Sequence, residues 1–280
     1  MELNATFIIF YRRDNTKRMQ NLGCILDFYR KNVTDAKFVI VEDSQFPTLM
    51  TDPQMLPAFH KDFVYTWVPN TEEWNKSRGY NMGIKLATTE RLVFNDVDAI
   101  IHPKQLLLSF EQLEEHQGGI IYPYNGEFLC TDAAVKAEFA ENVDYDVLSR
   151  RYPKYLPISN SNPMAYVNRV DDGILFGHYN STGGCVLSHK TAMEACNGYN
   201  PNFNGWGYED DEMPKRFHKL GYDVLRLNGE RFPCWHLDHT DETSSPKETQ
   251  ENYGDNKCLF EEVSSYTRGE MKNYIKTWKM

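Results

Sequence analysis

Three short stretches of the sequence concentrate the residue types that bind metals and move protons. The stretch "FNDVDAI" carries Asp96 and Asp98 after an apolar run, and "CWHLDH" carries His236 and His239. The third, "FNGWGYEDDE" (203–212), places four consecutive acids after a loop of glycines and aromatics. Carboxylates and imidazoles coordinate divalent cations and act as general acids or bases. The sequence therefore predicts a metal site and acid–base chemistry in one protein.

Asp96 and Asp98 lie near the end of a predicted strand over residues 91–101. In an extended chain, residues i and i+2 point to the same side, so we expect both carboxylates on one face. Ligands of open α/β sheets bind beyond the carboxyl ends of the strands. Carboxylates there can hold a hard divalent cation, which in turn can hold a diphosphate. In the plainer alternative Asp96 caps a turn and Asp98 is solvated, and D-x-D spacing alone does not decide.

The two histidines stand three positions apart and can reach one ion if the segment turns. With Asp98 they form a mixed nitrogen and oxygen ligand set, which suits Mn²⁺ better than an all-oxygen Mg²⁺ site. For the pair in isolation, two ordinary histidines in an aromatic loop is the preferred interpretation.

The loop before the four acids has the composition of a sugar-binding surface. Gly205 and Gly207 permit backbone shapes that other residues resist, and the indole of Trp206 offers a platform for the apolar face of a sugar ring. The acids at 209–212 fall in the first turn of the next helix, where the helix dipole favours negative charge. That explains one or two acids, but four repel one another. The pattern therefore favours a carboxylate site that handles a sugar over a solvated helix end.

The elements that must position these residues alternate between strand and helix. Expected strands cover 5–11, 37–43, 62–68 and 91–101, with helices over 15–32 and 75–90 between them. The later half is less regular. A strand and a turn are expected at 118–130, and strands at 183–190 and 222–227. Helices are expected at 132–152, directly after 190, and from the acidic cluster to near Gly221, with a loop at 152–168. Alternation of this kind predicts an α/β fold with a mostly parallel, Rossmann-like sheet flanked by helices. No repeat or low-complexity linker divides the chain, so we expect a single domain.

The C-terminal segment is amphipathic. Met271, Tyr274, Ile275 and Trp278 share one helical face, and lysines occupy the other. Such a helix could lie on an anionic membrane, but packing against its own domain is the preferred interpretation.

Composition narrows the function classes. The 280 residues carry a formal net charge of -10 and a pI near 5.3, which disfavours duplex nucleic acid as a partner. None of the six cysteines form a C-x-x-C pair, and the apolar run at 5–11 is too short for a signal sequence or a transmembrane segment. We therefore expect a cytoplasmic protein with reduced thiols.

"GWGYEDDE", preceded by "STGGCVLSHK" and "NDVDAI", resembles the metal-dependent GT-A glycosyltransferases, above all the β-1,4-galactosyltransferase family and chondroitin-polymerase-type domains. Motif order and rough spacing are kept over residues 7–239. The resemblance implies one GT-A domain over 1–280. About 1–110 would hold the nucleotide sugar and metal, about 111–245 the acceptor, and 246–280 would be a helical extension.

The resemblance also implies an activity: inverting transfer of galactose, N-acetylgalactosamine or a similar sugar from a UDP-sugar to an acceptor hydroxyl. Mn²⁺ is the implied cofactor, with Mg²⁺ as an alternative. Asp210 is the implied general base. The implied donor-binding residues are Phe10, Arg12, Lys76, Asp96, Gly184 and Trp206. The acceptor side would use Trp206, Tyr208, Glu209 and Asp211, and the metal ligands would be Asp98, His236 and His239.

Several positions depart from the family pattern. Phe10 replaces a proline. Tyr208 replaces a glycine, and this larger side chain narrows the expected acceptor site. His236 stands where galactosyltransferases carry methionine, which loosens the preference for soft metals. Ser181 stands where a bulky tyrosine restricts the C2 substituent of the donor sugar, so the donor sugar stays open.

Two other functions remain as alternatives. A metal-dependent nucleotidyltransferase or pyrophosphatase explains D-V-D but not "GWGYEDDE". A catalytically silent protein that binds glycans or nucleotide sugars would bind metal and UDP without turnover. The expected acceptor is a glycan, a lipid-linked glycan or another molecule that bears a hydroxyl, and a modified nucleobase stays open.

Overall fold

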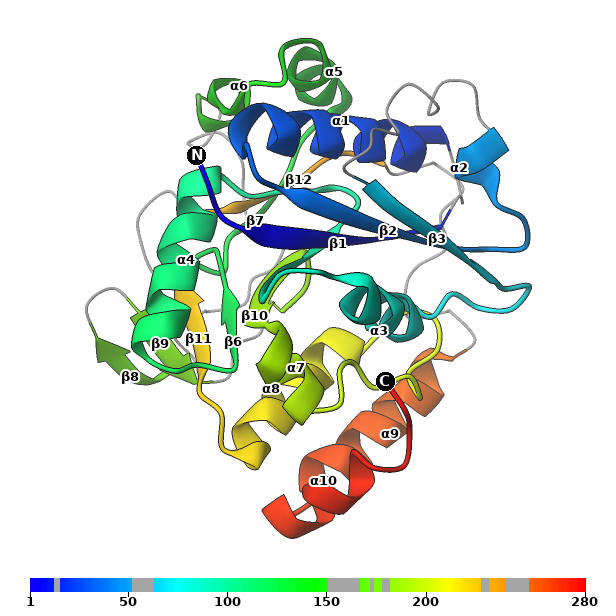
Figure 1. Cartoon of the computed structure of the whole chain (residues 1–280), viewed down its shortest axis with the longest axis vertical. Coiled ribbons are helices and arrows are strands. Elements are labelled where there is room, and N and C mark those ends of the chain that lie inside the picture. The colour runs from blue at the N-terminus through cyan, green and yellow to red at the C-terminus, as the bar shows by residue number, and fades with distance from the viewer. Residues whose placement is uncertain are drawn as a thin grey trace.

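The computed structural model describes residues 1–12, 16–51, 63–150, 167–171, 174–177, 182–227, 232–239 and 252–280. Its central element is a nine-stranded sheet (Figure 1). The strands are β1 (Ala5–Tyr11), β2 (Lys37–Ser44), β3 (Phe63–Pro69), β4 (Arg91–Asp96), β6 (Ile120–Tyr122), β8 (Val167–Asp171), β9 (Ile174–Gly177), β10 (Cys185–His189) and β11 (Val224–Leu227). Their order is β3-β2-β1-β4-β10-β6-β11-β9-β8.

Most strands of this sheet run in one direction. The pairs β3-β2, β2-β1, β1-β4 and β6-β11 are parallel. Only β10 and β9 run the other way, each antiparallel to both of its neighbours. The expected mostly parallel α/β sheet is confirmed, and the reversal at β10 brings the start of that strand next to the carboxyl end of β4.

Helices cover both faces of the sheet. α1 (Thr16–Asn32) lies on one face of β1 and β2, and α3 (Lys76–Leu86) lies on the other (Figure 1). The alternation of strand residues explains this arrangement: the ring of Phe7 packs 4.5 Å from that of Tyr29 in α1, whereas Ile8 faces α3. A side chain in place of Gly83 would collide with Ile8, so this glycine lets α3 lie close to the sheet.

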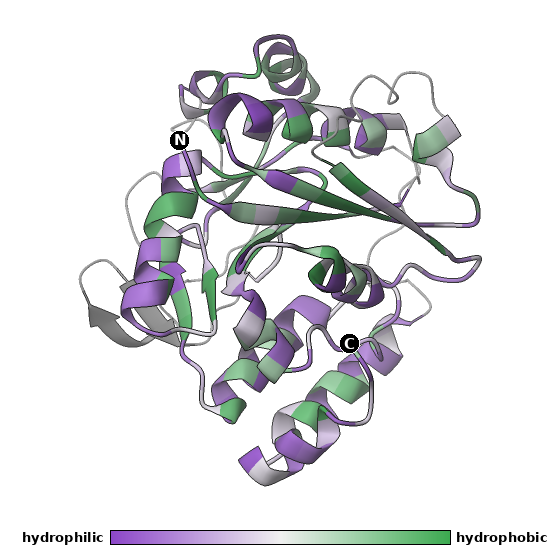
Figure 2. Ribbon diagram, in the orientation of Figure 1, coloured by the Kyte–Doolittle hydropathy of each residue, from purple (hydrophilic) through white to green (hydrophobic). Residues whose placement is uncertain are grey.

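The remaining elements surround this core. The helices are α2 (Thr48–Thr51), α4 (Pro103–Glu115), α5 (Ala133–Asn142), α6 (Tyr145–Ser149), α7 (Lys190–Ala195), α8 (Glu209–Leu220), α9 (Tyr253–Ser265) and α10 (Arg268–Tyr274). A second sheet contains β5 (Ala99–Ile100), β12 (Cys234–His236) and β7 (Phe128–Cys130) in that order. Figure 2 shows the apolar residues gathered on the central strands and the polar residues on the outer helix surfaces.

Two sequence-based boundaries are wrong. The helix expected over 132–152 is two helices, because Val143 adopts a left-handed conformation with φ of 48° and ends α5. The strand expected over 91–101 ends at Asp96, and a turn at 97–98 leads into β5 of the other sheet. Asp96 and Asp98 therefore do not share one face of a continuous strand. Most of the loop expected at 152–168 lies outside the described residues, whereas its last two positions belong to β8.

The C-terminal segment packs on its own domain, as expected. Met271 in α10 is fully buried, and α10 contacts α8. Trp278 donates an indole hydrogen bond of 2.9 Å to the carbonyl of Asn197. Among the described residues, no helix combines the length and apolar composition needed to cross a membrane.

Candidate active site

The predicted site residues gather at one edge of the central sheet. The carboxyl ends of β1 and β4, the start of β10 and the first turns of α3 and α8 meet there. Two clusters form, which we call the metal cluster (Asp98, His236 and His239) and the carboxylate cluster (Asp96, Asp210 and Lys76). The turn after β4 joins them, since Asp96 belongs to one cluster and Asp98 to the other.

The metal cluster brings together residues from distant parts of the chain. One ligand atom from each of Asp98, His236 and His239 lies within 4.8 Å of the others. Nε2 of His239 is 2.9 Å from Oδ2 of Asp98, and Nε2 of His236 is 3.4 Å from Oδ1. One carboxylate and two imidazoles at this spacing form a ligand set that suits a first-row divalent cation.

Electrostatics hold this cluster in its charged form. Burial alone would raise the pKa of Asp98, but the charge and hydrogen bond of His236 hold it well below its usual range. Burial would lower the pKa of His236, but Asp98 raises it to about 10. The carboxylate thus attracts positive charge strongly, and a divalent cation can take the place of the imidazole protons.

The small sheet positions these ligands. His236 in β12 pairs with Ala99 in β5 and with Cys130 in β7. The amide of Leu237 donates a 2.7 Å hydrogen bond to the carbonyl of Asp98, which fixes the turn against β12. The sulfur of Cys130 lies 3.4 Å from Nδ1 of His236, so Nε2 is the ring nitrogen turned toward Asp98.

The carboxylate cluster is built around one buried lysine. Nζ of Lys76 lies 2.9 and 3.1 Å from the two carboxylate oxygens of Asp210 and 3.0 Å from Oδ1 of Asp96. Tyr80 donates a hydrogen bond to Asp96, and so does the amide of Gly184. Gly184 adopts a φ of 83°, and a side chain there would collide with Phe128, so the close approach to Asp96 requires glycine.

These charges set the protonation of the cluster. Burial would lower the pKa of Lys76, but Asp210 and Asp96 raise it well above its usual range, so the lysine stays charged. Burial raises the pKa of Asp210 to about 6, Lys76 opposes that rise, and Asp96 adds to it. Near neutral pH Asp210 is therefore mostly ionised and close to the pH at which a general base works best.

The four acids of α8 have four different environments. Asp210 binds Lys76, and Asp211 accepts a 2.8 Å hydrogen bond from Thr182. Glu209 is buried, accepts a hydrogen bond from the amide of Gly207, and has a pKa raised to about 8 by burial and by Asp210. Glu212 is fully buried and pairs with Arg216 at 2.8 Å. The acidic run thus combines a structural ion pair with three side chains near the predicted site.

The aromatic loop stacks against α9. Trp206 and Tyr253 form a parallel pair with ring centroids 5.6 Å apart and an angle of 10°. Tyr208 stacks on Phe260 at 5.1 Å, and its hydroxyl lies 3.2 Å from that of Tyr253. The C-terminal extension therefore contributes aromatic surface next to Trp206 and Tyr208, two of the four residues predicted to contact the acceptor.

Backbone shape and one asparagine fix this loop. Gly205 and Gly207 have φ values of 68° and 114°, as expected of glycine, and Tyr208 adopts a φ of 68° directly before α8. The amide of Asn75, which caps α3, donates hydrogen bonds to the carbonyls of Pro201 and Phe203. The start of α3, where Lys76 lies, is thus tied to the loop that leads into α8.

Phe10 and Arg12 lie at the end of β1, next to α3. Phe10 packs between Trp74 and Tyr80 and fits against Gly79, so it has a packing role. Arg12 lies 3.6 Å from Asp43 and donates a 2.7 Å hydrogen bond to a backbone carbonyl. Donor contacts by these two residues stay a prediction.

Sequence reasoning missed several residues of this region. Asn75 could have been found as an asparagine directly before a predicted helix, which is the preferred position for a cap. Tyr80, Thr182, Cys130 and Tyr253 gave no signal, because ordinary core or surface residues of these types look the same in a sequence.

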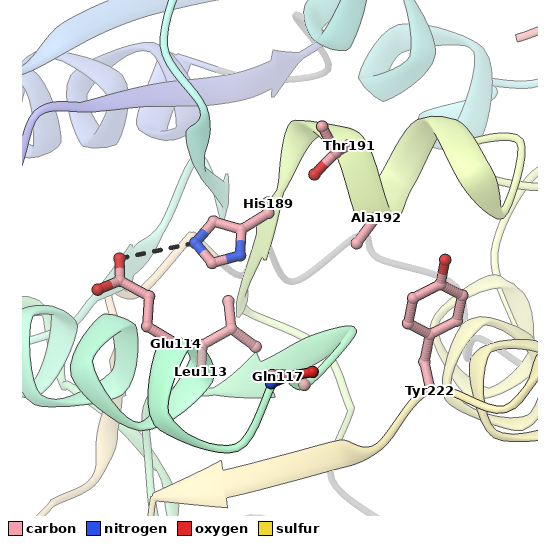
Figure 3. A pocket seen from close by; sticks show the side chains of 8 residues that line it. Leu113, Glu114, Gln117, His189, Thr191, Ala192 and Tyr222 are labelled. Atoms are coloured by element: carbon pink, nitrogen blue, oxygen red, sulfur yellow. Dashed lines mark ion pairs between the residues drawn. The ribbon is translucent and has the colours of Figure 1, made fainter.

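A hollow lies at the edge of the central sheet opposite the two clusters. It has a volume of about 400 Å³ and is lined by residues near the starts of β6 and β11 and the end of β10. Figure 3 shows His189 pointing toward Glu114, 3.7 Å away, with Tyr222 across the hollow. None of the predicted site residues line it, so the site described above does not depend on it.

Comparison with known proteins points to one fold. Residues 175–240 match the family model described as N-terminal domain of galactosyltransferase. A stretch of 53 residues is 40% identical to mouse β-1,4-galactosyltransferase 7, covering 19% of this chain and 16% of that protein.

Solved structures agree over most of the chain. GalNAc-T7 with UDP, GalNAc and Mn²⁺ superposes with a TM-score of 0.62 at 12% identity, covering 98% of this chain and 50% of that one. A mutant of a Drosophila β-1,4-galactosyltransferase 7 with manganese, UDP-Gal and xylobiose gives 0.52 at 13% identity, covering 95% and 81%. The Pyrobaculum calidifontis mannosyltransferase PcManGT with GDP-Man and Mn²⁺ gives 0.52 at 14% identity, covering 86% and 58%.

The chain spans about half the length of two of these structures and a sixth of the curated relative. The comparisons confirm the expected GT-A fold and the resemblance to galactosyltransferases. The chain has the fold of the GT-A glycosyltransferases, and its segment 175–240 resembles the galactosyltransferase domain.

Proposed function

We propose that this protein is a metal-dependent glycosyltransferase that moves a sugar from a nucleotide diphosphate donor, UDP-galactose or a similar UDP-sugar, to an acceptor hydroxyl. The observation that carries the proposal is the joining of two clusters by one turn: Asp98 lies among His236 and His239, and Asp96 lies beside Lys76 and Asp210. A cation site and a carboxylate base next to each other suit the two ends of a breaking glycosidic bond.

Asp98, His236 and His239 would hold the cation. A divalent cation bound there would supply positive charge to the diphosphate leaving group. Mn²⁺ fits this ligand set, and the three neighbouring structures described above contain it. With imidazole rather than thioether at position 236, Mg²⁺ also fits.

Asp210 would act as the general base. Its carboxylate would take the proton of the acceptor hydroxyl as the oxygen attacks the anomeric carbon from the side opposite the diphosphate, which inverts the configuration. General-base assistance contributes ~10²–10⁴-fold in rate. The pKa of about 6 leaves Asp210 ionised at neutral pH, as this role requires.

The donor would bind between the end of β1 and the turn after β4. Arg12, Asp96 and the backbone at Gly184 lie at that edge. The neighbours contain both UDP-Gal and GDP-Man, so the fold alone does not select the nucleotide base. The similarity of residues 175–240 to galactosyltransferases supports a UDP-sugar, either galactose or N-acetylgalactosamine. Ser181, which bears on that choice, lies outside the described residues.

The acceptor would lie against the aromatic loop. Trp206 and Tyr208 present ring surface beside Asp211 and the buried Glu209, so sugar rings with apolar faces are the acceptors that fit this surface best. Glycans and lipid-linked glycans have such rings. All six cysteines are free, which supports a cytoplasmic setting for the reaction.

Purified protein incubated with Mn²⁺ and a panel of nucleotide sugars tests the proposal. Release of UDP, and transfer with inverted configuration to an acceptor found by the same screen, are the expected results. Asp210→Asn should abolish transfer and keep UDP binding, whereas near wild-type transfer would refute the base assignment. Release of nucleoside monophosphate would indicate a nucleotidyltransferase or pyrophosphatase, and UDP binding without turnover would indicate a silent binding protein.

A further inference from the structure

We infer that Lys76 is a positioning residue for Asp210: its ammonium group holds the carboxylate of the base in place and in the ionised form. This inference rests on the proposed function. It differs from the donor-binding role that the sequence resemblance implies for Lys76, because the contacts of the side chain go to the base and to Asp96.

The geometry leaves little of the ammonium group for other partners. Lys76 has three N–H donors, and its Nζ has three carboxylate oxygens within 3.1 Å: both oxygens of Asp210 and Oδ1 of Asp96. The side chain is 8% exposed. A lysine so enclosed, with its donors matched by acceptors, acts on those acceptors first.

The position of Lys76 in the fold makes the contact rigid. The residue follows Asn75, the cap of α3. The side-chain amide of Asn75 donates a hydrogen bond to the carbonyl of Phe203, in the loop that leads to α8. Asp96 ends β4 and is held by Tyr80 and the amide of Gly184. The ammonium therefore joins the start of α3, the end of β4 and the first turn of α8.

The surroundings of Asp210 are otherwise acidic. Asp96 faces it from β4, and Glu209 and Asp211 are its neighbours in α8. Several tyrosine hydroxyls also lie in the electrostatic environment of this cluster, namely Tyr80, Tyr122 and Tyr199. The tyrosine hydroxyls are neutral where Asp210 titrates, because their pKa values are raised well above 10. Without the lysine, burial and the charges of Asp96 and Asp211 would favour the protonated carboxyl of Asp210, which cannot accept a proton from the acceptor.

The pH dependence of kcat/KM for transfer tests this role. Lys76→Gln and Lys76→Met remove the charge at similar volume, Lys76→Arg keeps it, and Lys85→Gln is a control in the exposed part of the same helix. In the wild-type protein the acid limb of the profile is expected near pH 6. We expect both neutral variants to move this limb upward by about 1–3 pH units, and Lys76→Arg and Lys85→Gln to leave it in place.

A lysine that only binds the donor would give a different result. The neutral variants would then weaken UDP binding, measured by calorimetry with Mn²⁺, and leave the acid limb unmoved, which would overturn the inference. If neither neutral variant folds, ¹³C titration of the Asp210 carboxyl in the wild-type chain decides, with Asp210→Asn for assignment. A midpoint near pH 6 supports the inference, and a midpoint above about 8 refutes it. This titration needs no turnover, so it tests Lys76 even if no donor is cleaved.

Discussion

Nε2 of His239 lies 2.9 Å from Oδ2 of Asp98, although the two residues belong to opposite parts of the chain. Asp98 lies in the turn between β4 and β5, and His239 follows β12, so the three-stranded sheet brings them together. Asp98 is buried and has His236 as its other partner in the cluster. If the cluster is the proposed metal site, metal affinity is expected to depend on each of the three side chains.

His239→Ala should weaken Mn²⁺ binding more than about 100-fold, because even outer-shell partners of metal ligands contribute about 10–100-fold. Titration of free Mn²⁺ by electron paramagnetic resonance measures this without any substrate. His218→Ala, at an exposed position of α8, is the control and should bind as the wild type does. Equal affinity of the two variants would contradict the metal site.

His236→Met should change metal selectivity. A thioether binds Mg²⁺ poorly, whereas imidazole is compatible with harder cations. We expect Mg²⁺ to support UDP release by the wild-type protein, and the ratio of Mg²⁺- to Mn²⁺-supported rates to fall in the variant. A ratio unchanged by the substitution would show that His236 does not bind the cation.

The sequence was sufficient to predict those parts of the candidate site whose residues are chemically distinct. Asp98, His236 and His239 can all ligate metals, and the structure places them together. The alternation of strands and helices predicted the parallel half of the central sheet, since short apolar runs rich in β-forming residues differ clearly there from helical apolar spacing. The glycines around Trp206 have the positive φ values expected of them.

The turn after Asp96 could not be predicted in the same way. Val97, Ala99 and Ile100 are buried, because the chain passes directly from the core of one sheet into another. A continuous apolar pattern therefore hid a change of direction. The contact between Lys76 and Asp210 depends on the relative placement of α3 and α8, and long-range placement of this kind leaves no local pattern.

Glu209→Gln should make stability less dependent on pH. The carboxyl has a pKa of about 8 in the folded protein against a usual value of 4.5, so the folded state keeps a proton that the unfolded state loses. The stability contributed by Glu209 is fully present below about pH 4.5 and is lost as the pH rises through 8. Urea unfolding at pH 5 and pH 8.5 should show a wild-type loss of up to a few kcal/mol that is smaller in the variant. An identical loss in both proteins would show that Glu209 titrates normally.

Glu212→Gln, on the same turn of α8, should instead lower the unfolding free energy at neutral pH. Glu212 and Arg216 are both fully buried and form an ion pair of 2.8 Å, and Arg216 also donates to the carbonyl of Cys196. Removal of the carboxylate leaves a buried guanidinium without its charge partner and should cost about 3–5 kcal/mol of unfolding free energy. The measurement is urea unfolding at pH 7. A loss below about 1 kcal/mol would show that this acid is not structural.

Tyr253→Ala should impair use of the acceptor more than use of the donor. The ring of Tyr253 lies parallel to that of Trp206, 5.6 Å away, and supports the indole from the side of α9. An aromatic pair of this kind contributes ~0.5–1.5 kcal/mol, so we expect acceptor KM to rise about 2- to 10-fold. Donor KM should rise less than acceptor KM. Trp206 is predicted to contact both substrates, but the metal and carboxylate clusters, which would hold the rest of the donor, do not include Tyr253. Tyr253→Phe keeps the stacking and loses only the 3.2 Å contact between its hydroxyl and that of Tyr208, so it should behave as the wild type does. A rise in donor KM instead, or equal effects of both variants, would show that the stack does not hold Trp206 for the acceptor.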